Sequence, residues 1–115
     1  MSYAKFGIIE NFDKNKNYGK EYTPHEYNCI TIYDDIIDAW WKRLSIMKSY
    51  FHCYDRPEFA LARYGVTLIP PESLDLFDDI ILTNTPKKFY HQIPPLSDLI
   101  QRAKRENKFI IHYGI

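Results

Sequence analysis

The chain of 115 residues has few cysteines and few glycines, and it lacks a net charge and a long apolar run. Two cysteines are too few for a disulfide framework, so Cys29 and Cys53 are expected to be reduced, buried thiols. Fifteen lysines and arginines balance fifteen aspartates and glutamates, which excludes a strongly basic nucleic-acid binder. With 45% hydrophobic residues, the composition is that of a globular protein and excludes a disordered chain or a membrane-spanning protein.

The length predicts a single globular domain over residues 1–115. Residues 1–10 lack a basic segment followed by a long apolar run, so no signal peptide is predicted. The expected location is therefore the cytoplasm.

Motifs for catalysis, nucleotides and metals are missing as well. None of the four glycines stands in a phosphate-binding pattern, and no nucleophile-elbow pattern G-x-S-x-G occurs. His25 precedes Cys29 by four residues and His52 adjoins Cys53, but such pairs do not recur with the spacing of a zinc site. The sequence thus predicts no catalytic residue, no cofactor and no metal.

Hydrophobic periodicity predicts three helices and four strands, which gives an α/β (α+β) class. The expected order is strand, strand, helix, strand, helix, helix, strand, with the helices on one face of a small mixed sheet. The terminal strand, with Phe109, Ile110 and Ile111 in a row, is expected to be central. An antiparallel sheet with one solvated face is the alternative. The expected strands are 3–10, 28–33, 59–69 (one bent strand or a short hairpin) and 108–113, and the expected helices are 34–51, 72–82 and 96–107.

The apolar stripe of the first helix recurs every three or four residues from Ile36 to Phe51. Asp34 stands where the N-cap of this helix is expected. A second stripe follows from the spacing of Leu74, Phe77 and Ile81. The residues expected to be almost fully buried are Trp40, Leu44, Met47, Phe77, Ile81, Ile110 and Ile111.

Residues 11–22 have no period and are rich in Asn, Lys and Gly, so they are expected to form a long, mobile loop with few apolar anchors. Three lysines interleave there with Tyr18 and Tyr22, a weak pattern for single-stranded nucleic acid. Because the net charge is zero, a solvated loop is favoured and nucleic acid is not predicted as a partner. Tyr18 and Tyr22 remain candidates for contact with a protein partner.

An acidic cluster stands in the second helix, on a face expected to lie opposite its apolar stripe. Its members are Glu72, Asp75, Asp78 and Asp79. They either stabilise and solubilise the helix or form a negative patch for a basic partner. Three further carboxylates, Asp34, Asp35 and Asp38, would extend such a patch.

The segments 68–74 (LIPPESL) and 108–115 (KFIIHYGI) resemble those of small bacterial proteins, some of them immunity proteins of polymorphic and contact-dependent toxin systems. The resemblance implies a non-enzymatic module that binds and blocks one cognate toxin domain. No membrane is expected as a partner, because the composition already excludes a membrane-spanning protein. Such toxins are often nucleases, whose basic clefts an acidic face could occupy. The rival is a small enzyme or ligand-binding domain with a pocket lined by tyrosines and a histidine as acid or base. A subunit of a homo-oligomer is the third hypothesis.

Overall fold

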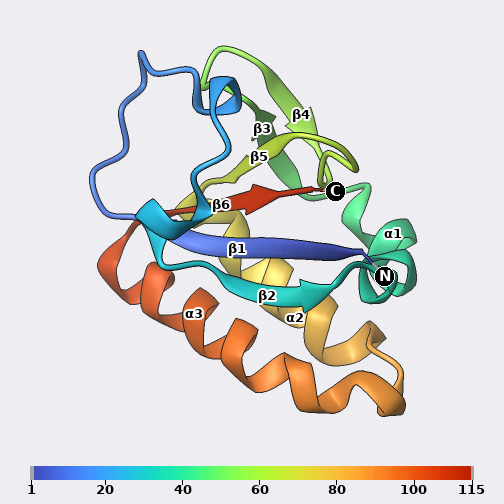
Figure 1. Ribbon diagram of the computed structural model, residues 1–115. Coiled ribbons are helices and arrows are strands. Elements are labelled where there is room, and N and C mark those ends of the chain that lie inside the picture. Colours follow the sequence, from blue (N-terminus) through green and yellow to red (C-terminus); the bar gives the residue numbers. More distant parts are fainter. Residues whose placement is uncertain (1, 115) are drawn as a thin grey trace.

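The computed structural model describes residues 2–114 and contains one antiparallel sheet with three helices in that part of the chain (Figure 1). The α/β class is confirmed, whereas the expected mixed sheet of four strands is wrong, because the described residues form six strands and every pairing is antiparallel. The strand order is β2-β1-β6-β5-β3-β4, which makes the terminal strand an interior one as predicted. The strands are β1 (Tyr3–Ile9), β2 (Ile30–Tyr33), β3 (Lys48–Phe51), β4 (Pro57–Phe59), β5 (Val66–Ile69) and β6 (Phe109–Tyr113).

The helices α2 and α3 lie side by side against the sheet, and α1 lies at the end of the sheet near both chain ends (Figure 1). α3 begins three residues earlier than expected, with two prolines in its first turn, where they need no N–H partner. The stretch 84–95, between the two expected helices, therefore contains the end of α2, a short 3-10 segment and the start of α3. The helices are α1 (Asp34–Leu44), α2 (Leu74–Asn84) and α3 (Ile93–Glu106), and the 3-10 segments are η1 (Tyr18–Lys20), η2 (Pro24–Tyr27), η3 (Pro71–Ser73) and η4 (Lys87–Gln92).

The first helix is much shorter than the predicted 34–51. It ends at Leu44, where a turn closed by the Met47 amide and the Leu44 carbonyl (2.9 Å) leads into β3. The Ala60 amide donates to the Met47 carbonyl at 2.9 Å, so a distant segment holds this turn. Met47 is buried as expected, but Phe51 belongs to a strand paired with β5 and not to the helix.

Residues 59–69 are neither a bent strand nor a hairpin. Phe59 ends β4, which forms a hairpin with β3, while Val66 begins β5 on the other side of β3. Between them the chain turns at Gly65, whose φ of 99° suits glycine. The Thr67 hydroxyl accepts a hydrogen bond from the Ala62 amide at 2.7 Å, so a side chain satisfies the turning backbone.

The main core lies between the sheet and the helices. Alternate residues of β1 (Ala4, Phe6 and Ile8) point into it and meet the apolar stripes of the helices. All seven residues predicted to be buried have 0% exposure, which confirms the stripe of α2, the stripe of α1 as far as Leu44, and the interior position of β6. Met47 is buried from the turn that follows α1.

The other face of the sheet is covered by the chain between β1 and β2. Tyr18 and Phe12 come from this segment and pack on side chains of β5 and β6, so the solvated face of the antiparallel alternative is also wrong here. The buried residues of this second cluster are Ile9, Tyr18, Val66, Leu68, Ile111 and Tyr113.

Both edges of the sheet limit pairing with a further strand. Pro57 gives β4 a position without an N–H group. On β2, the Tyr33 amide donates to the Gln92 side-chain oxygen at 2.8 Å.

Candidate functional site

The predicted acidic face of α2 is interrupted by the burial of Asp78. This carboxylate is 8% exposed and accepts hydrogen bonds from the Ser97 hydroxyl (2.8 Å) and the Gln101 amide (2.7 Å) of α3. The placement of Asp78 opposite the core is thus wrong. Asp78 follows Leu74 by four residues and precedes Ile81 by three, which puts it on the core side of the helix. Ser97 and Gln101 are four residues apart, which places both on one face of α3, and this spacing could have indicated a pair of donors for a carboxylate.

The remaining carboxylates of this cluster, Glu72, Asp75 and Asp79, are exposed. Asp75 forms an ion pair with Lys104 of α3. Glu72 and Asp79 are in no ion pair with another residue of the part that the structure describes. The acidic surface is therefore smaller than predicted.

An apolar hollow lies where α2 ends and α3 begins. Its volume is about 330 Å³, and its lining is mostly apolar. Leu82 is 53% exposed and Tyr90 is 51% exposed, although both border a buried core. Half-exposed apolar side chains around a hollow are typical of protein contact sites. The lining residues are Ile81, Leu82, Tyr90, Ile93 and Pro94.

Two exposed carboxylates stand one helical turn from residues that line this hollow. Their position follows from the packing of the two helices. The ion pair of Asp75 with Lys104 and the hydrogen bonds of Asp78 with Ser97 and Gln101 show that α2 and α3 run antiparallel in a defined register. Residues three or four apart are neighbours on a helix surface. Asp79, three residues before Leu82, and Asp98, four residues after Pro94, therefore lie one turn from the hollow, one on each helix.

Sequence reasoning singled out neither Asp98 nor the hollow. Asp98 is exposed and has no ion pair with the residues described. Its helical spacing from Pro94 was the available signal. On the η4 side, Lys87 and Lys88 are exposed, and the Lys88 ammonium lies 5.1 Å from the centroid of the adjacent Phe89 ring.

Two of the three predicted carboxylates of α1, Asp34 and Asp38, form ion pairs with Arg63. Asp34 is 4% exposed, and its burial raises the pKa of the carboxyl while the nearby Arg63 guanidinium opposes that shift. Arg63 also contacts Asp38. The predicted cap is wrong, because Tyr33 takes the N-cap position and Asp34 is the first helical residue. Only Asp35 of the three is exposed without an ion pair to another described residue.

Arg63 joins this region to two exposed aromatic residues. Its guanidinium lies over the Trp41 ring at 5.5 Å, and Trp41 is 45% exposed. Tyr64, the next residue in the chain, is 71% exposed. Although these residue types are common at interfaces, the charges around them are already paired.

The loop 11–22 is anchored more firmly than predicted. Tyr18 is buried, its amide donates to the His52 carbonyl (2.7 Å), and its hydroxyl accepts from the Asp13 amide (2.9 Å). Phe12 stacks on the Tyr18 ring at 5.5 Å. Tyr22, by contrast, is 65% exposed. The expectation of few apolar anchors is wrong, and of the two tyrosines only Tyr22 offers a large accessible surface.

Two clefts of about 400 and 330 Å³ flank Tyr18, and both are lined by Lys16, Tyr18 and Tyr27. Neither includes a histidine. The alternative of a pocket shared by tyrosines and a histidine therefore gains no support from these two clefts.

The two inner histidines serve the packing of the fold. His112 is fully buried beside Phe6, one ring nitrogen lies 3.2 Å from the Thr67 hydroxyl, and its Nε2 has no hydrogen-bond partner. Burial lowers the pKa of His112 to about 3, so the ring is neutral. His52 packs against Gly19 so closely that a Cβ there would lie 1.8 Å from its Nδ1.

The two thiols are not activated. Burial raises the pKa of Cys29 to about 11. The Cys53 thiol donates to the Asp55 carboxylate at 2.8 Å, and this bond raises the pKa of Cys53. Both shifts disfavour the thiolate, which is the nucleophilic form. In residues 2–114 no three His, Cys, Asp or Glu side chains gather in a way that could hold a metal ion.

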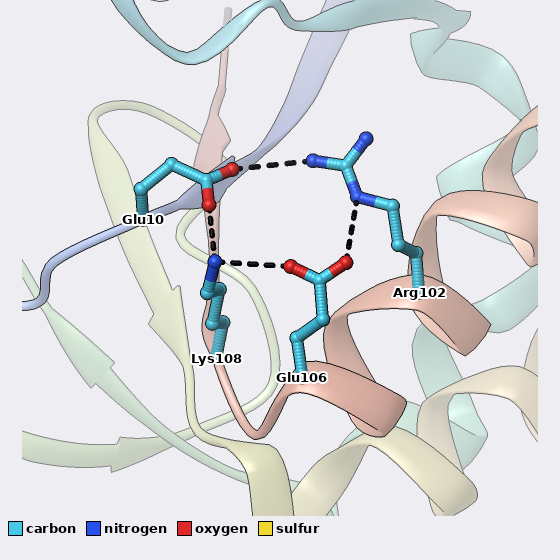
Figure 2. A network of polar contacts seen from close by, with 4 residues as sticks. All are labelled: Glu10, Arg102, Glu106 and Lys108. Carbon is cyan, nitrogen blue, oxygen red and sulfur yellow. Dashed lines mark hydrogen bonds and ion pairs between the residues drawn. The ribbon is translucent and has the colours of Figure 1, made fainter.

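A ring of four charged side chains joins β1 to the turn between α3 and β6 (Figure 2). Glu10 contacts Lys108 and lies 3.2 Å from the Arg102 guanidinium. Glu106 closes the ring, at 2.9 Å from Lys108 and 3.5 Å from Arg102. Because its two positive and two negative charges cancel, this ring ties elements together and leaves little net charge for a ligand.

No protein-family model, curated protein or solved structure matches this chain. Within residues 2–114, the helices are too short or too polar to cross a bilayer; the longest, α3, has 14 residues.

Proposed function

We propose that the protein is a non-enzymatic binding module of the cytoplasm, an immunity protein that occupies and neutralises a cognate toxin domain. One observation supports this most: an apolar hollow with half-exposed Leu82 and Tyr90 lies beside exposed carboxylates of two helices. Apolar contact residues surrounded by polar ones are the usual anatomy of a protein interface. We name this the α2–α3 surface and define it by Asp79, Leu82, Tyr90, Pro94 and Asp98. Glu72, in η3 before α2, adds a further exposed carboxylate at the other end of that helix.

The two parts of the α2–α3 surface would have different tasks. Exposed carboxylates attract a basic domain and speed its encounter, as is expected for the substrate cleft of a nuclease. The hollow would then accept an apolar side chain and slow dissociation. Affinity would therefore depend on the hollow, whereas the salt dependence of the association rate would come from the exposed carboxylates such as Asp79 and Asp98.

The proposal is tested with the gene next to this one in the source genome. The C-terminal domain that this gene encodes is expressed in bacteria with and without the protein, and growth is measured. We expect the neighbouring product to arrest growth alone and to copurify with this protein when growth is restored. Failure to bind or to protect contradicts the immunity function.

The surface is tested by reversing the charges of Glu72, Asp79 and Asp98 to Lys. Asp75 and Asp78 are left intact, since both bond to α3. Electrostatic steering changes association rates by roughly 10- to 1,000-fold, so the triple variant should associate at least about tenfold more slowly at low salt. A matched variant with Glu21, Glu26 and Glu58 changed to Lys has the same charge and should keep the rate of the unmodified protein more closely. Equal rates for both variants would contradict the choice of surface.

A further inference from the structure

The hollow at the end of α2 has a chemistry of its own. Leu82, Tyr90 and Pro94 make it apolar, and it is open to solvent although Ile81 and Ile93 on its floor are buried. Its volume of about 330 Å³ is near the lower end of small-ligand pockets and is large enough for one bulky side chain.

The charges beside the hollow differ between its two sides. On the helix side, Asp79 and Asp98 stand one turn away, without an ion pair to any residue between 2 and 114. On the η4 side, Lys87 and Lys88 are exposed, and Lys88 lies against the Phe89 ring. The carboxylates come from two helices held in register by the buried contacts of Asp78, whereas the lysines follow one another in a short 3-10 segment.

From this arrangement we infer that the hollow binds an aromatic or aliphatic side chain that is directly followed by a cationic group, as in an apolar–Lys or apolar–Arg pair of a partner. The apolar group removes Leu82 and Tyr90 from water, and the cation meets Asp79 and Asp98. The inference rests on the proposed function for its biological meaning, but its chemistry can be tested without the toxin.

The test uses two small probes of one shape and opposite charge, 2-phenylethylammonium and 3-phenylpropionate, at equal ionic strength. Each is titrated into the full-length protein, and the side-chain methyl signals of Ile81, Leu82 and Ile93 are followed by NMR. We expect the ammonium probe to shift these signals with a Kd about three- to tenfold lower than that of the carboxylate, the preference expected of two exposed charge contacts. Equal or tighter binding of the carboxylate, or shifts elsewhere only, would overturn the inference.

Three variants separate the contributions of the apolar contact and of the carboxylates to probe binding. Leu82→Asn should abolish the Ile81 and Ile93 methyl shifts with the ammonium probe. Asp79→Asn with Asp98→Asn should keep aromatic binding but bring the two Kd values together. Asp75→Asn, on the same helix but paired with Lys104 away from the hollow, should change neither Kd. An unchanged preference in the double variant would also overturn the inference.

Three further outcomes are distinguished. If the methyl signals of Leu82 move when the protein alone is concentrated, a second copy covers the hollow and the inference is wrong. If the probes bind as expected but the neighbouring gene product does not, the toxin proposal fails and the site remains. If the toxin binds but the probes do not, the inference fails alone.

Discussion

The two faces of the sheet are built in different ways. The helix face buries a continuous cluster of mostly aliphatic side chains, with Trp40 and Phe77 at its centre in edge-to-face contact at 5.9 Å. The loop face is smaller and depends on rings, with Phe12 stacked between Tyr18 (5.5 Å) and Phe109 (3.7 Å).

Polar atoms also differ between the two faces. On the loop face, the Tyr18 hydroxyl accepts a bond from Asp13, and the Tyr113 hydroxyl lies 3.4 Å from that of Thr23. On the helix face, His112 keeps one ring nitrogen without a partner. Tyrosine can thus cover a sheet next to solvent because its hydroxyl group keeps a hydrogen bond. The imidazole of His112, inside the helix face, must instead remain neutral.

The largest expected effect is on the helix face. Leu44→Ala should lower the free energy of unfolding by about 2–5 kcal/mol, because Leu44 is fully buried and its truncation leaves a cavity. The measurement is denaturant unfolding, with Leu82→Ala as the exposed control. A loss below about 0.5 kcal/mol for Leu44→Ala would contradict the burial of this stripe.

Removal of the stack on the loop face should cost less. Phe12→Ala is expected to lower the free energy of unfolding by about 1–3 kcal/mol, since Phe12 is only partly buried but stacks on two rings. Amide exchange in residues 11–22 should accelerate more than exchange in β6. Phe59→Ala, at a half-exposed ring on the edge strand, is the control. If amide exchange in the loop were unchanged, Phe12 would not be its anchor.

The pH dependence of stability should reveal the neutral imidazole of the helix face. The pKa of His112 is about 3 in the fold and roughly 6.5 when unfolded, so protonation favours the unfolded chain as the pH falls below about 6.5. Its contribution is fully present above that pH and should fall by about 1–1.5 kcal/mol between pH 7.5 and 5.5. His112→Leu should flatten this slope, while His91→Gln, at an exposed site, should not. Equal slopes in all three proteins would show that His112 is accessible to protons.

The smallest expected effect concerns the charged ring at the end of the sheet (Figure 2). Glu10→Gln removes its contacts with Lys108 and Arg102, which should lower the Tm slightly because exposed ion pairs contribute little. Added salt should reduce the difference, since it screens these charges. Glu58→Gln serves as the control, and a salt-independent loss would indicate that Glu10 acts through packing.

Several features of the candidate site could be predicted, and others could not. The exposed positions of Glu72, Asp75 and Asp79 follow from helical periodicity. The burial of Asp78 depends on donors 19 and 23 residues away in the sequence, and the neutralisation of Asp38 depends on Arg63. Periodicity places a side chain on a face of its own element but does not say which element packs there.

The sequence by itself determined the class, the apolar stripes of α1 and α2, and the interior strand β6, because these follow from local periodicity and burial. Only the tertiary structure decided where α1 ends, which strands pair, and that Tyr18 turns inward onto the sheet. The physical reason is that residues 11–22 have no decisive local preference, whereas the helical period of residues 45–51 is overridden by strand pairing. Their conformation is set by long-range hydrogen bonds, such as those of Ala60 to Met47 and of Tyr18 to His52, which form only in the assembled fold.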